Sequence, residues 1–283
     1  MTLAPEIRPM NRCNRSWECV MATVGLGLLM FDGPAIAAEM PLKAPVLKAV
    51  YDWTGFYVGV NIGGIWSSGG SSSNLVTPAG FTFLTVDEPG SLGGGKSGVI
   101  GGGQAGYNWQ TGMFVLGVET DFDGTSLSRS GSFVGPSFFN PITGTPDFLT
   151  FNGTARLDWL GTTRGRVGFV ATPDNRLMFY GTGGVAYGGG SANFSFFDSA
   201  IPGAIWTGSP SSTRVGWTLG GGVEYAITYN ITLKAEYLYY NLGNSNTVVS
   251  PSATAALDFP GVFATRRVSF DGSIFRAGVN YKF

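Results

Sequence analysis

The chain has 283 residues, a net charge of −1 and only 12% charged residues. This small, balanced charge gives no electrostatic reason to expect nucleic acid as a partner. The sequence contains no histidine, which excludes His-based catalytic triads and zinc sites built on histidine. Its 45 glycines and 14% aromatic residues favour a protein of many strands and turns with an apolar exterior.

The N-terminus has the three regions of a secretory signal peptide. Basic residues precede the apolar run "VMATVGLGLLMF", and Ala35 and Ala37 then form a small-residue cleavage site. About 12 apolar residues are too few for a helix that crosses a bilayer of about 30 Å, so a membrane anchor is the weaker interpretation. We predict a cleaved signal peptide over residues 1–37. Both cysteines, Cys13 and Cys19, fall within it, so the mature chain would have no disulfide.

Residues 38–52 contain prolines and show no periodicity, which predicts an extended periplasmic lead-in. From Trp53 onward, apolar and polar residues alternate in short segments separated by turn-forming residues, the pattern of β-strands. We therefore predict one β domain over residues 53–283. Its eight expected strands are 53–66, 98–109, 113–123, 155–170, 177–188, 213–226, 231–242 and 268–283.

Each strand has one apolar face and one charged face. In the seventh segment, Ile231, Leu233 and Ala235 share the first face, whereas Lys234 and Glu236 share the second. A soluble sandwich would bury the apolar face and leave the charges in water. A membrane barrel would instead turn the apolar face to lipid and the charges inward.

The connections between the strands decide between these folds. Long connections at 67–97, 124–154, 189–212 and 243–267 alternate with short ones at 110–112, 171–176 and 227–230. This alternation is typical of an even-stranded antiparallel barrel with tight turns on its periplasmic side. Aromatic residues near the strand ends fit the two belts expected at the membrane surfaces. We predict an all-β fold, an eight-stranded antiparallel transmembrane β-barrel with four long surface loops and short periplasmic turns, in the outer membrane.

Two motifs carry a family resemblance. "WTGFYVGVNIGG" opens the first strand, and "FRAGVNYKF" closes the last one. They resemble the small outer-membrane β-barrel (OmpA-like) family, and in particular the surface-antigen porin-family proteins of alphaproteobacteria. The resemblance implies an eight-stranded barrel whose terminal strand, with Tyr281 and Phe283, is a signal for the barrel-assembly machinery. It does not fix an activity, because the family is functionally mixed.

The stretch "GSLGGGKSG" matches the Walker A pattern of nucleotide-binding loops, G-x-x-x-x-G-K-[ST]. A P-loop needs a buried strand before it and a helix after it, so that helix N–H groups hold the phosphates. The residues that follow, "GVIGGGQAGYNWQTG", are too rich in glycine for a helix and alternate as a strand does. The overlapping G-x-G-x-x-G at Gly101, Gly103 and Gly106 fails for the same reason. We expect no nucleotide, no cofactor and no metal.

The inward charges are the main candidate site. They are Glu119, Asp121, Arg156, Asp158, Arg164, Arg166, Arg214, Glu224, Lys234, Glu236 and Arg276. An eight-stranded barrel has an interior just wide enough for side chains to fill, and buried charges must be paired. A structural ion-pair network that fills the lumen is the favoured interpretation. A narrow path for solutes or ions is the alternative, and an enzymatic carboxylate pair is the weakest, so we expect no enzyme.

The long loops are rich in Ser, Thr, Gly, Asn and Pro, with aromatic residues such as those of "SFFNP" and "NFSFF" that we expect to be exposed. Such loops commonly contact external molecules. Three functions remain open: a structural barrel that supports envelope integrity, a narrow porin-like channel, and a loop-mediated adhesin or ligand-binding protein. The expected partners are outer-membrane lipid and lipopolysaccharide, the barrel-assembly machinery and an extracellular ligand of the loops.

Overall fold

The computed structural model describes residues 50–76, 82–87, 97–135, 138–140, 144–199, 201–209 and 211–283. The predicted signal peptide with Ala35 and Ala37 lies outside these residues, as does most of the predicted lead-in. Residues 90–96 of the Walker-like stretch also lie outside them. Ser97 and Gly98, which complete the stretch, begin a strand instead of a helix.

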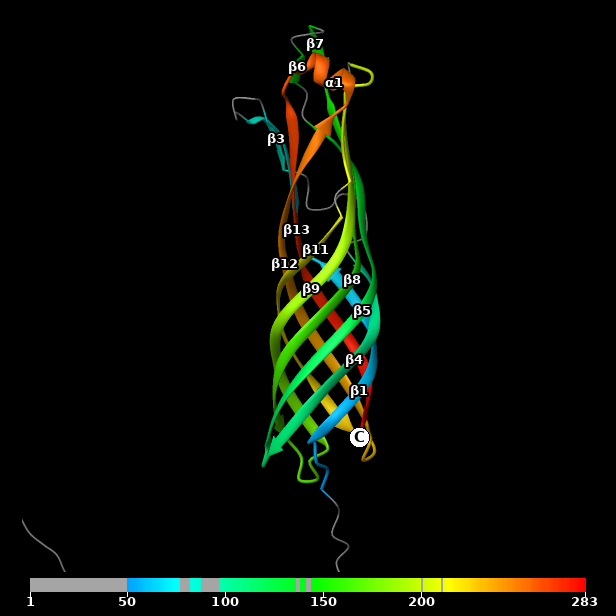
Figure 1. Cartoon of the computed structure of the whole chain (residues 1–283), viewed down its shortest axis with the longest axis vertical. Helices are drawn as coiled ribbons and strands as arrows, with labels where there is room; N and C mark the ends of the chain where they lie inside the picture. The colour runs from blue at the N-terminus through cyan, green and yellow to red at the C-terminus, as the bar shows by residue number, and fades with distance from the viewer. Residues whose placement is uncertain are drawn as a thin grey trace, which may run out of the picture. The chain divides into compact units, whose positions relative to one another are not determined.

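Eight long antiparallel strands form a closed ring (Figure 1). In ring order they are β1 (Gly55–Ser67), β4 (Ser97–Thr111), β5 (Phe114–Val134), β8 (Leu149–Val170), β9 (Leu177–Asp198), β11 (Ser211–Ala226), β12 (Ile231–Pro251) and β13 (Phe263–Lys282). The ring closes where β13 pairs with β1 through Val60 and Val279. Closure leaves no sheet edge in this part of the wall, as a bilayer requires. The predicted eight-stranded antiparallel barrel is confirmed.

The strands alternate between the lumen and the exterior. On β5, Val115, Glu119 and Asp121 are buried, whereas their neighbours Phe114 and Val118 are exposed. The exposed side chains are therefore apolar, and the buried set includes charges. This arrangement follows from the period of two residues along a strand, which sends successive side chains to opposite faces.

Short turns join the strands at one end of the barrel. Gly112 and Met113 connect β4 to β5, with Gly112 in a left-handed conformation (φ 61°) that favours glycine. Residues 171–176 connect β8 to β9, and residues 227–230 connect β11 to β12. The second and third turns lie where the sequence predicts them, and the first lies at residues 112–113 instead of the predicted 110–112.

At the opposite end, the strands continue well beyond their predicted limits. The structure ends β5 at Val134, begins β8 at Leu149, ends β9 at Asp198, ends β12 at Pro251 and begins β13 at Phe263. The segments expected to be loops are thus largely strand. On β8 and β12 the reason is a β-bulge, with register shifts between Ala155 and Trp159 and between Asn241 and Asn244, whereas the alternation along β5, β9 and β13 continues unbroken. An extra residue reverses which face each later residue occupies, so the alternation that marks a strand in the sequence is interrupted.

We call the described residues within 71–87, 128–155, 192–208 and 244–268 the extension. It also contains the short strands β2 (Ser71–Val76), β3 (Thr82–Asp87), β6 (Phe138–Asn140), β7 (Thr145–Asp147) and β10 (Ile205–Gly208) and the helix α1 (Ala253–Asp258). β2 pairs with β13, and β10 lies between β9 and β12, so these strands continue the wall where β1 and β11 have ended. Within the described residues, no helix is both long and apolar enough to cross a membrane.

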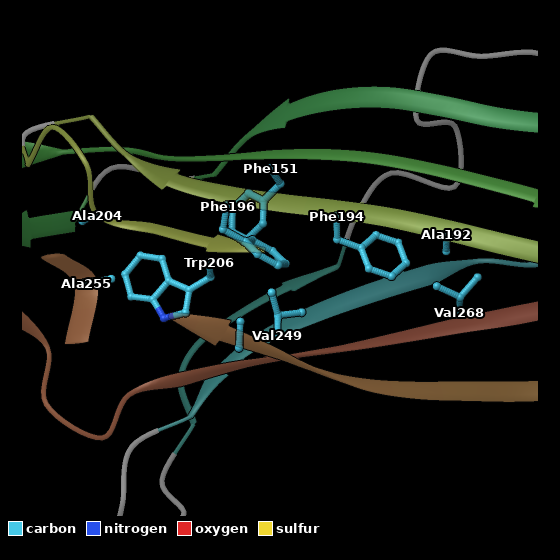
Figure 2. Packing of buried hydrophobic residues seen from close by; sticks show 10 residues of the cluster. Phe151, Ala192, Phe194, Phe196, Ala204, Trp206, Val249, Ala255 and Val268 are labelled. Atoms are coloured by element: carbon cyan, nitrogen blue, oxygen red, sulfur yellow. The ribbon is translucent and has the colours of Figure 1, made fainter. Parts of the chain in front are cut away.

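The extension has an apolar core of its own. Phe151, Phe194, Phe196 and Trp206 point into the space between its strands and pack with Val249 (Figure 2). Phe151 and Phe196 form an edge-to-face pair with ring centroids 4.7 Å apart. Phe197 of "NFSFF" is exposed as expected, but the expectation is wrong for Phe194 and Phe196 of the same segment. They alternate with Asn193 and Ser195 because this segment is an inward-facing stretch of β9.

Candidate functional site

Arg164 of β8 lies at the centre of the barrel interior. Its Nη2 is 2.7 Å from Glu119 Oε1 and 2.9 Å from Asp121 Oδ2, and its Nη1 is 2.8 Å from Glu236 Oε1. Its Nε donates to Thr162 Oγ1. Arg164 is 1% exposed, so its charge is compensated by these carboxylates and not by water.

Arg276 of β13 joins the same carboxylates from the other side of the ring. Its Nη2 is 2.6 Å from Asp121 Oδ2 and 2.8 Å from Glu236 Oε2, while its Nη1 is 2.6 Å from Asp123 Oδ2. Arg164 and Arg276 therefore share Asp121 and Glu236. The shared carboxylates connect β5, β8, β12 and β13 across the lumen.

Arg166 extends the cluster toward the short turns. Its Nη2 is 2.6 Å from Glu224 Oε2, and its Nη1 donates to the hydroxyl of Tyr57. The Tyr57 hydroxyl in turn donates to Glu119 Oε2 at 2.7 Å. The guanidinium also lies 4.1 Å above the ring centroid of Tyr180, a cation–π geometry. Rings from β1 and β9 thus fix the position of this arginine.

Lys234 and several neutral side chains add further hydrogen bonds to the carboxylates. Lys234 Nζ donates to Glu119 Oε1 at 2.8 Å. Further donors to the carboxylates are Asn61 to Asp123, Thr162 to Asp121, Tyr180 to Glu236, and Thr232 and Asn280 to Glu224. We call Glu119, Asp121, Asp123, Arg164, Arg166, Glu224, Lys234, Glu236 and Arg276 the charge cluster. Its five carboxylates exceed its four cations by one, and these neutral donors stabilise the surplus negative charge.

Apolar layers enclose the charge cluster on both sides. Toward the extension, Ile65, Ile100, Leu160, Leu238 and Ile274 fill the lumen, and the first two are fully buried. The charged and apolar layers follow one another along β12, where Lys234 and Glu236 of the charge cluster are followed on the same face by Leu238. A cavity of about 10 Å³ beyond this layer has room for about one water molecule. The described side chains therefore block the lumen at this level.

The chain just before β1 closes the other mouth. Tyr51 and Trp53 are each 1% exposed and pack with Val115, Val170 and Met178. Trp53 Nε1 donates to the carbonyl of Asn175, 2.8 Å away in the turn between β8 and β9, and the Tyr51 N–H donates to the carbonyl of Asp174. We expected Trp53 to begin the first strand. It lies before β1, because these bonds turn its ring into the barrel mouth.

Eight of the eleven predicted lumen residues come together in the charge cluster, but Arg156, Asp158 and Arg214 do not. Arg156 and Asp158 are exposed, and Leu157 between them is buried. The bulge between Ala155 and Trp159 reverses the alternation on this part of β8, so the prediction that both charges face the lumen is wrong. Arg214 lies nearer the extension, with its guanidinium 4.1 Å above the ring centroid of Phe270.

Sequence reasoning missed Asp123, which is 1% exposed and bound to Arg276. Asp123 lies on the same face of β5 as Glu119 and Asp121, so the alternation along this strand could have identified it. The neutral partners Tyr57, Asn61, Gln104, Thr162, Tyr180, Thr232 and Asn280 were also missed, because uncharged inward residues give no charge signal. Within the described ranges, no group of three or more acidic, histidine or cysteine residues is arranged to hold a metal ion.

The outer wall between the turns and the extension is apolar. Phe56, Val58, Val60 and Ile62 are exposed on β1, and Trp66 follows at the far end of that strand. From Phe56 to Trp66 the wall spans about 11 residues, which matches the about 9–11 that a tilted strand needs to cross a bilayer.

Pairs of aromatic rings lie at both ends of this wall. At the short-turn end, Tyr107 contacts Phe56 and Trp109, Phe114 contacts Phe169, and Tyr281 contacts Phe283. At the distal end, Phe122 stacks on Trp159, and Trp217 contacts Tyr239. An apolar band between two aromatic belts defines a transmembrane β-barrel. Tyr281 and Phe283 are both exposed at the short-turn end, and their role as an assembly signal stays a prediction.

The comparisons with known proteins agree with this class. Residues 35–283 match the family described as the outer membrane protein beta-barrel domain. The 31 kDa outer-membrane immunogenic protein of Brucella melitensis is 38% identical over 265 residues, which cover 90% of this chain and 95% of that protein. The 22 kDa outer membrane protein of Rhizobium leguminosarum bv. viciae is 32% identical over 70% of this chain and 67% of that protein. The chain belongs to the outer membrane protein β-barrel family and is located in the outer membrane.

Among solved structures, the chain is similar to the outer membrane protein OprG of Pseudomonas aeruginosa, with 11% identity and a TM-score of 0.47. This similarity covers 83% of this chain and 98% of OprG. Neisserial surface protein A is 16% identical, with a TM-score of 0.29 over 81% of this chain and 98% of that one.

Proposed function

We propose that this protein is a non-enzymatic, closed barrel that supports the integrity of the outer membrane and carries the extension as its surface-exposed part. The observation that carries the proposal is the filled lumen. The charge cluster lies between two apolar layers, and Arg164 at its centre contacts three carboxylates from two strands. A network that shares its charges in this way stabilises the wall and places every charged side chain of the cluster against an opposite charge.

The narrow channel is the weaker candidate. A conducting path would need water beside the charges, but Arg164 and Arg276 are each 1% exposed, and Ile65 and Ile100 are fully buried. Single-channel recording on refolded protein in planar bilayers tests this point. We expect no unitary currents from the wild-type protein. Clear unitary currents whose size changes in Arg164→Ala or Glu224→Ala would contradict a closed barrel.

The envelope role needs a cellular test. A strain that lacks the protein should become sensitive to detergent and to bulky antibiotics that an intact outer membrane excludes. Re-expression of the wild-type chain should restore resistance, and so should a variant from which the β6–β7 segment (residues 138–147) has been removed. If the deletion strain is as resistant as its parent, the envelope role is wrong.

A loop-mediated adhesin or ligand-binding protein is the second candidate. The ordered extension favours it, because a core of Phe151, Phe196 and Trp206 fixes the surface that carries α1 and β10. Relatives of this chain are named as outer-membrane immunogenic proteins, and surface exposure of the extension is consistent with such a role here. Removal of residues 138–147 should then abolish binding to host cells while the folded barrel remains.

A further inference from the structure

A shallow groove of about 350 Å³ lies where β8, β9 and β11 run side by side. Asp158 and Trp159 of β8 line it on one side, and Ser211 and Thr213 of β11 line it on the other. Gly189 of β9 lies between them and pairs with both Trp159 and Thr213. The groove therefore extends across three neighbouring strands. The groove takes no part in the charge cluster or in the lumen.

The bulge in β8 builds this groove. It adds one residue between Ala155 and Trp159, so the Asp158 carboxylate is exposed next to the indole instead of facing the lumen. Bulges commonly redirect a side chain in this way. The indole lies against the backbone of Gly189, where an added Cβ would be 2.3 Å from Trp159 Nε1. A glycine is therefore required at position 189, because a side chain there would overlap the indole.

The polar groups of the groove have no partners in the described part of the chain. The carboxylate of Asp158 and the hydroxyls of Ser191, Ser211 and Thr213 make no hydrogen bond or ion pair to described residues. Ser212 differs, since it accepts a hydrogen bond from Arg214. One acceptor, three hydroxyls and an aromatic face thus converge on one concave surface, which is how ligand sites fix the orientation of a bound molecule.

The chemistry of the groove matches a sugar ring. The C–H face of a pyranose packs on an aromatic ring, while its hydroxyls bond to carboxylates and to other hydroxyls. Among the described residues, no cation lines the groove, and Asp158 repels anions, so phosphate groups are disfavoured. The volume lies at the lower end of the about 300–1,000 Å³ range of ligand sites, which suits one or two rings.

The position of the groove indicates where the sugar comes from. Trp159 stacks on Phe122 with ring centroids 5.3 Å apart and also contacts Tyr187, so it belongs to the distal aromatic belt. This belt marks the end of the apolar wall, where hydrocarbon gives way to lipid headgroups. We propose that the groove binds a neutral saccharide ring in the headgroup of a glycolipid in the outer leaflet beside the barrel.

Fluorine NMR on protein labelled with 5-fluorotryptophan in nanodiscs tests the proposal. Loss of one resonance in Trp159→Phe assigns the signal of Trp159. Addition of rough lipopolysaccharide to the same nanodisc should shift this signal, and phosphatidylglycerol should not. Asp158→Asn should weaken the apparent affinity at least tenfold, because a carboxylate hydrogen bond of about 1.5–3 kcal/mol is replaced by a weaker amide contact.

Trp109 provides the internal control, because it is an exposed belt residue at the opposite end of the barrel. Its signal should not move with lipopolysaccharide. An equal shift at Trp109 and Trp159, or an unchanged affinity in Asp158→Asn, overturns the proposed site. Heat-modifiable gel mobility confirms that the variants retain the folded barrel.

The source of the sugar is tested separately. Lipopolysaccharide in the same nanodisc should bind far more tightly than the water-soluble oligosaccharide released from it by mild acid, because sharing one bilayer raises its effective concentration. If the free oligosaccharide binds as tightly as the membrane-embedded glycolipid, the proposed glycolipid source is wrong.

Discussion

The barrel and the extension are built largely from the same strands, but they differ in the side chains at the centre of their interiors. In the barrel, Val60 and Ile62 face outward while Arg164 and Glu119 lie inside. In the extension, Phe196 and Trp206 lie inside, whereas polar residues such as Asn193 are exposed. The bulges between Gly124 and Leu127 and between Ala155 and Trp159 lie close to the boundary between the two regions.

This difference shows that the solvent around a wall decides what its interior contains. Lipid accepts the apolar outer face of the barrel, so the interior must satisfy polar side chains with one another. Water surrounds the extension, so the hydrophobic effect places its aromatic residues inside. The following substitutions test whether the two interiors are held together by different forces.

The largest expected effect is the loss of Arg164. Arg164→Ala removes the cation that contacts Glu119, Asp121 and Glu236 together, and the cations that remain must balance these three buried carboxylates. Removal of one partner from a buried ion pair costs about 3–5 kcal/mol. Urea titration of the refolded barrel in lipid vesicles should show this loss of unfolding free energy. Arg156→Ala, an exposed arginine on the same strand, is the matched control, with a change of about 0.5 kcal/mol or less.

Trp206→Ala should break the extension while the barrel persists. The indole is 2% exposed and packs against Phe259 and the other members of the apolar core. Truncation of a buried tryptophan costs about 3–5 kcal/mol, and here the cost falls on the extension. Limited proteolysis should cut the extension faster, with an unchanged heat-modifiable gel shift. Simultaneous unfolding of barrel and extension would contradict two separate cores.

The same residue introduced on the two outer faces should have different effects. Ile62→Arg places a charge on the lipid-facing wall, where arginine costs about 2–4 kcal/mol near the middle of the bilayer. Asn193→Arg places the same side chain on the exposed face of the extension, with an expected change of about 0.5 kcal/mol or less. Unfolding free energies in lipid vesicles measure both. Equal costs would mean that lipid does not contact the wall at Ile62.

The smallest effect is expected at the cap of α1. The Ser252 hydroxyl accepts a hydrogen bond from the N–H of Ala255 and donates to the carbonyl of Gly203. Ser252→Ala should destabilise this helix by about 1 kcal/mol, without an effect on the barrel. Hydrogen exchange at residues 253–258 should become faster, and exchange in β1 should stay unchanged. A change in β1 would show that the extension and the barrel unfold together.

The sequence predicts the barrel well where its alternation is regular. Along β12 the pattern from Ile231 to Leu242 is uninterrupted, and the strand begins at the predicted residue. The prediction failed at the bulges, because one added residue puts Arg156 and Asp158 on the face that the period of two assigns to Leu157. The core of the extension could not be predicted, since its aromatic residues come from segments rich in Ser and Gly and gain a common face only through the paired strands.

The charge cluster also affects how the barrel assembles. Its members come from β5, β8, β11, β12 and β13, and Tyr57 of β1 joins them. A partial sheet that lacks β13 would hold Asp121 and Asp123 without Arg276, and a sheet that lacks β8 or β12 would likewise separate buried charges from their partners. Only the complete ring brings all of these groups together. The interior therefore favours complete barrels, because the free-energy cost of an unfinished ring rises with every strand already inserted.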